Sequence, residues 1–170
     1  MEYKEVIKAR FSCRKFDGRA VEPEKLERIL EAGRLAPTAK NLQGQRIYVA
    51  QSPEALGKID QITPCRYGAG TVLVVAFDKN AVFIFPGGKR NSGIEDATIV
   101  ATHLILAAAD EGLNSCWINF FEPDEAAKAL GLPENEEILM LMDLGYAAEG
   151  VVPSPNHTSR KPLSETVFYL

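Results

Sequence analysis

The hydrophobic pattern is dominated by one long apolar stretch, residues 92–112. Ser92 stands three residues before Glu95, which is the spacing of a helix capping box, and Gly112 follows the stretch as a C-cap glycine would. The second half is apolar nearly all round. The pattern therefore predicts a long helix that is buried on every side.

The remaining segments alternate between helical spacing and runs of β-forming residues. Helices are expected at 3–11, 24–35, between Pro53 and Pro64, and at 123–130, and strands at 46–50, 72–77, 114–119 and 138–144. Glu24 and Arg28 are four residues apart, so an ion pair is expected on the outer face of the second helix. Residues 82–85 fit either a short strand or an apolar loop.

The strands expected at 72–77 and 138–144 contain no charge except Asp143, which predicts central strands covered on both faces. Because helices and strands alternate, the sequence predicts a sheet flanked by helices on both faces, in the mixed α/β classes. A chain of 170 residues fits a single domain spanning 1–170.

Composition narrows the choice of partners. The formal net charge of −4 argues against nucleic acid or an anionic membrane as a partner. The N-terminus has no apolar core of a signal peptide, and His103 interrupts the long apolar run, so a cytoplasmic protein without a membrane span is expected. Cys13, Cys65 and Cys116 lie far apart without a metal-binding spacing, so free thiols are expected, and Cys116 is interpreted as a small buried apolar residue.

A local basic cluster follows the first predicted helix. Within residues 10–16, RFSCRKF, Arg10 and Arg14 flank Ser12, and two guanidinium groups beside a hydroxyl suit a phosphate. The alternative is that both arginines are solvated cations near a helix C-terminus, where the helix dipole favours them.

A loop rich in carboxamides, residues 36–45, follows the second predicted helix. Thr38, Asn41, Gln43 and Gln45 offer both hydrogen-bond donors and acceptors, as the edge of a heterocycle requires. The alternative is a turn in which these side chains bond their own backbone.

The last residues, from Gly150, contain three prolines, the basic run HTSRK and a final β-like ETVFYL. Such a tail cannot build its own core, so it is expected to lie along another surface, and tails of this kind often wrap a partner subunit.

Four segments in order resemble the nitroreductase family of FMN oxidoreductases. RFSCRKF resembles the family's R-x-S-x-R-x-F, and APTAKNLQGQRIYV resembles its A-P-S/T-x-x-N-x-Q-P-W-x-F-x-V. EDATIVATHLILAAADEGLNSCWIN resembles its long helix followed by G-L-x-S/T-x-W-I-G, and RKPLSETV resembles its closing R-K-P-L-E-E-x-V. Together they extend from Arg10 to Phe168.

The resemblance implies an α+β fold with a central, mainly antiparallel sheet, in an intertwined homodimer whose C-terminal tail extends onto the partner. It places two FMN sites in the interface. In each site, Arg10, Ser12 and Arg14 would hold the phosphate and ribityl side of FMN. Arg160 would close on the phosphate, and Lys161 is the second candidate for that role. The other subunit would reach the flavin with Pro37, Thr38, Ala39, Asn41 and Gln43. Ile118, Asn119 and Phe120 would pass their backbone beside the reactive N5 edge.

The implied activity is transfer of hydride from NAD(P)H through flavin N5 to a small acceptor of nitroaromatic, quinone, enone or flavin type, with ping-pong kinetics. The cofactor carries the chemistry, so no catalytic side chain is expected. The chain departs from the family pattern at Lys40, where glycine is frequent, and at Asn119 and Phe120, where the pattern is glycine-rich. Two alternatives stay open: the same fold with a specialised flavin reaction, or a non-catalytic flavin-binding redox partner in which Phe120 and residues 82–88 close the pocket.

Overall fold

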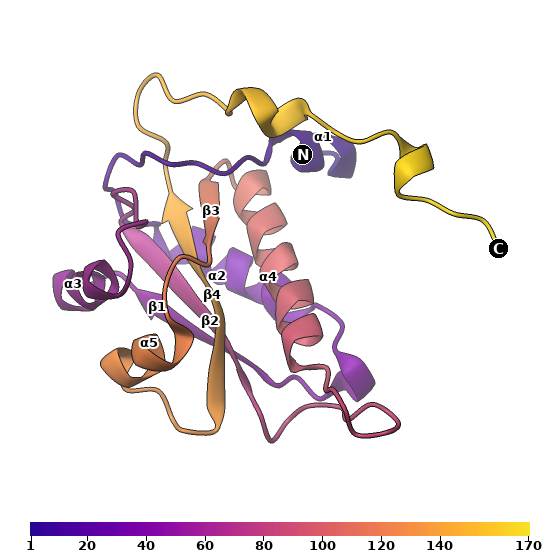
Figure 1. Ribbon diagram of the computed structural model, residues 1–170. Helices are drawn as coiled ribbons and strands as arrows, with labels where there is room; N and C mark the ends of the chain where they lie inside the picture. Colours follow the sequence, from indigo (N-terminus) through magenta and orange to yellow (C-terminus); the bar gives the residue numbers. More distant parts are fainter.

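The computed structural model describes all 170 residues and shows a four-stranded sheet with helices on both faces (Figure 1). The strands are β1 (Gln45–Ala50), β2 (Thr71–Asp78), β3 (Asn114–Ile118) and β4 (Glu136–Gly145). They are ordered β1-β2-β4-β3, and every neighbouring pair is antiparallel. The expected antiparallel sheet is confirmed, with β2 and β4 at its centre and β1 and β3 at its edges.

The helices are divided between the two faces of the sheet. α2 (Pro23–Arg34) and α4 (Gly93–Asp110) cover one face, and α3 (Pro53–Ile62) and α5 (Pro123–Leu130) cover the other. α1 (Tyr3–Ala9) lies at the C-terminal end of α4, where the N-terminal amine pairs with Asp110. Side chains alternate across β2, so Leu73 and Val75 pack toward α4 while Val72 and Val74 pack toward α3 and α5.

The two ends of α4 differ from each other in how well the sequence predicts them. Gly112 has a φ of +75°, and the Leu113 N–H donates to the Ala108 carbonyl at 2.8 Å, so the predicted glycine cap is confirmed. The predicted capping box is wrong. The Ser92 hydroxyl donates to Asp96 Oδ2 at 2.7 Å and accepts from the Phe83 N–H at 3.0 Å, because a contact with the preceding loop replaces the local cap.

The prediction that α4 is buried on every side is wrong for the single chain. Val100, Ala101 and Leu104 are fully buried, but Ile94 is 56% exposed and Ile99 is 37% exposed. The sheet and α2 cover only one side of the helix. An apolar surface of this chain is therefore left uncovered along α4.

One further local prediction fails because a more distant partner takes over, and one open choice is settled. Arg28 does not pair with Glu24; its guanidinium donates to both carboxylate oxygens of Glu111 at 2.7 Å, beyond the end of α4. Residues 82–85 form an apolar loop and no strand: Ile84 makes one bridge with Asn91, and the Phe85 N–H donates to the Arg90 carbonyl at 3.1 Å. We call residues 82–91 the 82–91 loop.

The only charged residue predicted within the central strands is deeply buried. Asp143 on β4 is 1% exposed, and its Oδ2 has no hydrogen-bond partner. Burial raises the pKa of Asp143 to about 8, opposed by the nearby Arg66 guanidinium and assisted by Asp60. Cys116, opposite Asp143 on β3, is also buried, and burial raises its pKa to about 11. The interpretation of Cys116 as a buried apolar residue is confirmed.

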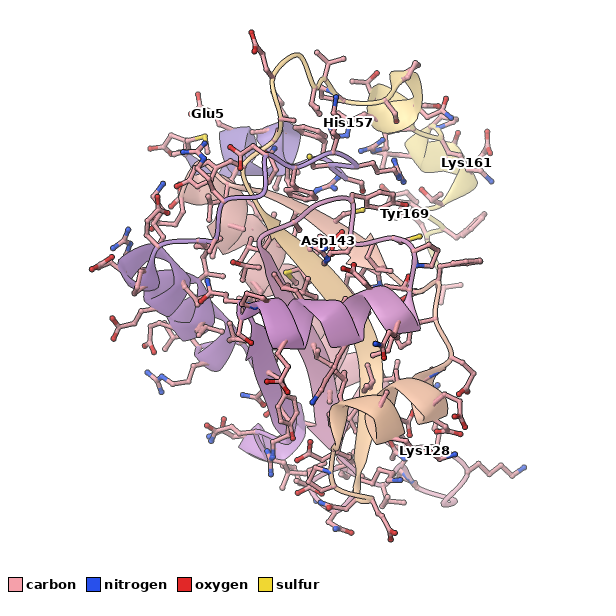
Figure 2. All side chains as sticks on the ribbon, turned by 90° about the vertical axis from the view of Figure 1, so that its left-hand side faces the viewer. Glu5, Lys128, Asp143, His157, Lys161 and Tyr169 are labelled. Carbon is pink, nitrogen blue, oxygen red and sulfur yellow. The ribbon has the colours of Figure 1, made fainter.

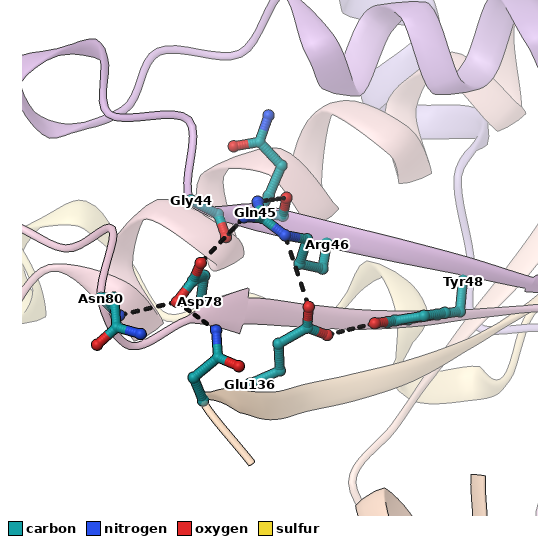
Figure 3. A network of polar contacts seen from close by, with 8 residues as sticks. Gly44, Gln45, Arg46, Tyr48, Asp78, Asn80 and Glu136 are labelled. Carbon is teal, nitrogen blue, oxygen red and sulfur yellow. Dashed lines mark hydrogen bonds and ion pairs between the residues drawn. The ribbon is translucent and has the colours of Figure 1, made fainter. Parts of the chain in front are cut away.

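A polar network closes the sheet where β1 begins (Figure 3). Arg46 Nη2 lies 3.0 Å from Asp78 Oδ2, and Arg46 Nε lies 3.6 Å from Glu136 Oε1. Tyr48 donates its hydroxyl to Glu136; burial first, and this bond second, raise the pKa of Tyr48 to about 12. The Gly44 carbonyl accepts the Asp78 N–H at 2.8 Å, so the network also anchors the carboxamide-rich loop.

The C-terminal tail leaves the body of the molecule. Its first short 3-10 helix, η2 (Pro155–Thr158), lies beside α1. The second, η3 (Leu163–Glu165), lies beyond α1, where the chain extends away from the sheet (Figure 1). Phe168 is 78% exposed and Tyr169 is 95% exposed, so the tail's apolar end packs against nothing in its own chain. None of the helices has the length and apolar content needed to cross a membrane.

Candidate functional site

Three of the predicted phosphate residues come together with the tail. Arg10, Ser12 and Arg14 line a pocket of about 250 Å³, and Arg160 closes it from the tail. The remaining lining residues, which the sequence analysis did not identify, are Phe11, Ser154, Asn156 and His157. Segments separated by some 140 residues of sequence thus form one pocket, as the resemblance implied.

The first wall of this basic pocket lies against the sheet edge. Ser12 bridges to Ser115 on β3, and the Cys13 N–H donates to the Ser115 carbonyl at 3.0 Å. Farther on, the Phe16 N–H donates to the Tyr67 carbonyl at 3.0 Å. These backbone bonds give the segment a fixed course, so alternate side chains, including Arg14, point away from the buried Cys13.

The second wall is the η2 helix of the tail. His157 Nε2 lies 3.3 Å from the Lys8 carbonyl, and the rings of His157 and Phe11 meet edge-on with centroids 6.2 Å apart. Figure 2 shows His157 at the same end of the molecule as Glu5 of α1. Arg160 Nη1 donates to the carbonyls of His157 and Ser159, both at 2.6 Å, which holds its guanidinium at the pocket.

The charge in the pocket is uncompensated. No acidic side chain lines it, and Arg10, Arg14 and Arg160 form no ion pair anywhere in the chain. In a protein of net charge −4, a pocket with only cationic and neutral donors attracts an anion. Guanidinium and hydroxyl donors together match the oxygens of a phosphate. Lys161 lies outside this pocket, with its ammonium 3.8 Å from Glu165.

The carboxamide-rich loop is held by α4 and is strained. The Ala39 N–H donates to Asp96 Oδ1 at 2.8 Å, and the Gln43 N–H donates to Thr38 Oγ1 at 3.0 Å. Three of its residues that are not glycine have left-handed φ angles: 51° at Lys40, 56° at Asn41 and 51° at Gln43. Such strain is frequent at functional sites, so the loop is a candidate for one. Asp96, in the first turn of α4, is the residue that positions the loop.

The two groups of predicted residues do not meet within one chain. Asp96 fixes the carboxamide loop, with Pro37, Thr38, Ala39, Asn41 and Gln43, at the N-terminal end of α4. The basic pocket lies with α1 and the tail at the other end (Figure 1). An α4 of 18 residues separates them by about 27 Å.

The third predicted group follows β3. Ile118 is buried, whereas Phe120 is 72% exposed. Thr63 Oγ1, itself buried, donates to the Phe120 carbonyl at 2.7 Å, and Trp117 Nε1 donates to Asn119 Oδ1 at 2.8 Å. One long-range bond and one local bond therefore pin the turn while leaving the Phe120 ring exposed, where it lines a shallow apolar pocket of about 370 Å³.

Taken together, the antiparallel sheet and its flanking helices define an α+β protein, and its basic pocket presents only cationic and neutral groups to a ligand. A sequence model of the nitroreductase family matches residues 7–66 and 63–146. The chain belongs to the nitroreductase family.

Similar proteins agree with this assignment. An Archaeoglobus fulgidus protein, provisionally named an NADH dehydrogenase/NAD(P)H nitroreductase, is 30% identical over 151 residues, which cover 83% of each chain. The crystal structure of a nitroreductase family protein from Clostridium difficile 630 is 36% identical, with a TM-score of 0.92 over 99% of this chain and 98% of the other. An Exiguobacterium sibiricum 255-15 nitroreductase-like protein, solved in complex with FMN, shares the fold at 22% identity and a TM-score of 0.86 over 100% and 98%.

Proposed function

We propose that this chain is an NAD(P)H-dependent FMN oxidoreductase that acts as a homodimer on a small organic acceptor. The observation that carries the proposal is the basic pocket, in which Arg10, Arg14 and Arg160 gather without any acidic partner. The names of the family relatives, NAD(P)H nitroreductases, support the same activity.

The residues fit FMN. The three guanidinium groups and Ser12 would bind its single phosphate, and the carboxamides of Asn41 and Gln43 would bond the edge of the ring system. FMN, when bound, accepts hydride from NAD(P)H and delivers electrons to the acceptor. Because the cofactor supplies this chemistry, the chain's own task is to bind, orient and exclude water.

Three features support the dimer. The two groups of site residues lie at opposite ends of α4, so one chain cannot bring them to one ligand. Ile94 and Ile99 leave an apolar surface along that helix. The tail carries apolar side chains that pack against nothing in their own chain. A two-fold partner laid along α4 would cover these surfaces and complete two identical sites.

The turn after β3 is proposed to lie beside the reactive edge of FMN. The Ser115 carbonyl points out of the sheet edge, where it accepts the Cys13 N–H. Backbone groups alternate along a strand, so those of Trp117 and Asn119 face the same free edge. Phe120 is 72% exposed and does not line the basic pocket, which favours an accessible enzyme over a closed, non-catalytic flavin carrier.

The purified protein is expected to be yellow and to release FMN, and not FAD, when denatured. The basic pocket is sized for one phosphate group, so a dinucleotide would leave a second phosphate without a partner. Mass spectrometry of the released cofactor makes the distinction.

The loaded protein should oxidise NADH or NADPH with menadione or nitrofurazone as acceptor, giving parallel double-reciprocal lines. Release of FAD, or flavin binding without turnover, would contradict the proposal.

A heterodimer tests whether the site is shared between subunits. Arg14→Ala and Asn41→Ala homodimers are each expected to retain FMN poorly. In the mixed dimer one site carries both lesions and the other carries none, because each half-site of a two-fold interface is repeated once. Co-expression with different tags and double affinity purification should therefore recover about one firmly bound FMN per dimer.

A site formed within one subunit predicts a different result for the mixed dimer. If Arg14 and Asn41 of the same subunit formed one site, each site of the mixed dimer would carry one lesion. No full-strength site would return, and the mixed dimer would retain no more FMN than its parents.

A further inference from the structure

The 82–91 loop and the carboxamide-rich loop together present a cationic patch, which we define as Lys40, Lys89 and Arg90. Lys40 Nζ lies 4.8 Å from the ring centroid of Phe83, and Arg90 Cζ lies 4.3 Å from that of Phe85. The two rings lie side by side with centroids 5.5 Å apart. Each of two neighbouring aromatic rings thus holds one cation.

No group within the chain compensates this patch. Lys40, Lys89 and Arg90 are exposed, and none of them forms an ion pair. A guanidinium that stacks on a ring by its face keeps its N–H groups free at the edge, in the fork that fits a phosphate. The patch is therefore free to bind an anion from outside the chain.

The backbone supports the same interpretation. Lys40 has a φ of 51° and a ψ of 20°, which is a strained conformation for a residue with a side chain. The base of the 82–91 loop is fixed, because the Ser92 N–H donates to the Phe83 carbonyl at 2.9 Å. Its turn is exposed and is closed by the Gly88 N–H, which donates to the Phe85 carbonyl at 2.9 Å; Gly87 and Gly88 have φ angles of +90° and +69°. Lys89 and Arg90 therefore lie at the solvent-exposed end of a loop whose base is fixed, with Arg90 held over the Phe85 ring.

We propose that Lys89 and Arg90, together with Lys40, bind the 2′-phosphate of NADPH and make NADPH the preferred reductant over NADH. The inference rests on the proposed function, since Lys40 belongs to the loop that reaches the FMN of the partner subunit. A 2′-phosphate is a monoester that carries close to two negative charges at neutral pH, whereas NADH has a neutral hydroxyl at that position. Three unpaired cations distinguish the two by charge and by the guanidinium fork.

The test uses the FMN-loaded protein and two adenosine fragments that cannot be reduced. Calorimetry should show that 2′,5′-ADP binds at least about tenfold more tightly than 5′-AMP, which lacks the 2′-phosphate. Lys89→Ala and Arg90→Ala should each weaken 2′,5′-ADP binding and raise the KM for NADPH by about tenfold, with 5′-AMP binding and the KM for NADH unchanged. Arg90→Lys, which keeps the charge but loses the fork, should fall between Arg90→Ala and the wild type.

Lys128→Ala is the matched control, because it removes one positive charge on α5, where Lys128 pairs with Glu125, and it should change none of these values. Equal binding of the two fragments, or equal losses with NADPH and NADH, would overturn the proposal. Failure of the proposed function looks different: the wild type would then hold no FMN and oxidise neither nucleotide. FMN content and thermal unfolding of each variant show that it is folded and loaded.

Discussion

Replacing Arg14 by alanine is expected to weaken FMN binding by about tenfold to a hundredfold, since a charge-assisted contact is typically worth about 1.5–3 kcal/mol. Arg14 lines the basic pocket with Arg10 and Arg160, and no carboxylate there shares its charge. Because no acidic group pairs with Arg14, its removal weakens the attraction for the phosphate and leaves no carboxylate unpaired. Titration of the apoprotein with FMN, followed by quenching of flavin fluorescence, gives the dissociation constant.

Arg34→Ala provides the control for charge. Arg34 is exposed and pairs with Glu31 at 2.6 Å on α2, away from the basic pocket, and exposed ion pairs contribute little. Both variants change the net charge by the same amount. Equal FMN affinity of Arg14→Ala and Arg34→Ala would show that Arg14 does not contact the phosphate.

Replacing Asp143 by asparagine is expected to stabilise the protein at pH 7–8 and to have little effect near pH 4. The carboxyl titrates near about 3.9 in an unfolded chain, but its pKa in the fold is raised to about 8. Between these values the native state holds a proton that the unfolded state has released, so stability falls as the pH rises. At pH 7 three pKa units of this difference amount to about 4 kcal/mol, as an upper estimate. Asparagine cannot ionise and lacks this dependence.

Urea unfolding at pH 4, 6 and 8 measures the effect. The wild type should lose stability steadily over this range, while Asp143→Asn should be nearly flat. Asp17→Asn is the control: Asp17 is exposed, and its bond to Arg19 holds its pKa below the usual value, so it stays ionised between pH 5 and 8. It should keep the wild-type slope between pH 5 and 8. The same slope in Asp143→Asn would mean that Asp143 is not the group responsible.

Local sequence predicted the elements well where one residue's environment is set by its neighbours. The apolar runs of β2 and β4, interrupted within the predicted ranges only by Asp143, are central strands because a strand that is apolar on both faces is covered on both faces. Gly112 ends α4 because few other residues adopt its backbone conformation. Ser52 likewise caps α3, where its hydroxyl accepts the Ala55 N–H at 3.1 Å.

The failures share one physical cause, which is a partner that is distant in sequence. The Ser92 hydroxyl accepts the Phe83 N–H of the preceding loop instead of a backbone N–H of its own helix, and Arg28 donates to Glu111. Periodicity shows that α4 is apolar nearly all round, but it cannot show whether its own chain or a second copy covers Ile94.

The candidate site also combines residues that the sequence predicts with residues that only the fold reveals. Arg10, Ser12 and Arg14 form a compact motif, and the family resemblance added Arg160 to them. Ser154, Asn156 and His157 follow no pattern in a polar tail, so only the fold reveals that they line the pocket. The position of Lys40 beside Phe83 was equally invisible, since 43 residues of sequence separate them.

The polar network at the start of β1 also bears on how molecules of this protein avoid one another. β1 ends the sheet, and its Tyr48 and Val49 are 37% and 40% exposed, so the strand resembles a template for adding a further strand. Arg46 places a guanidinium on that strand, between Asp78 and Glu136. Two such strands pairing edge to edge would bring ionised groups of the same kind together and strip them of water. The network therefore protects the sheet against aggregation as well as bracing it.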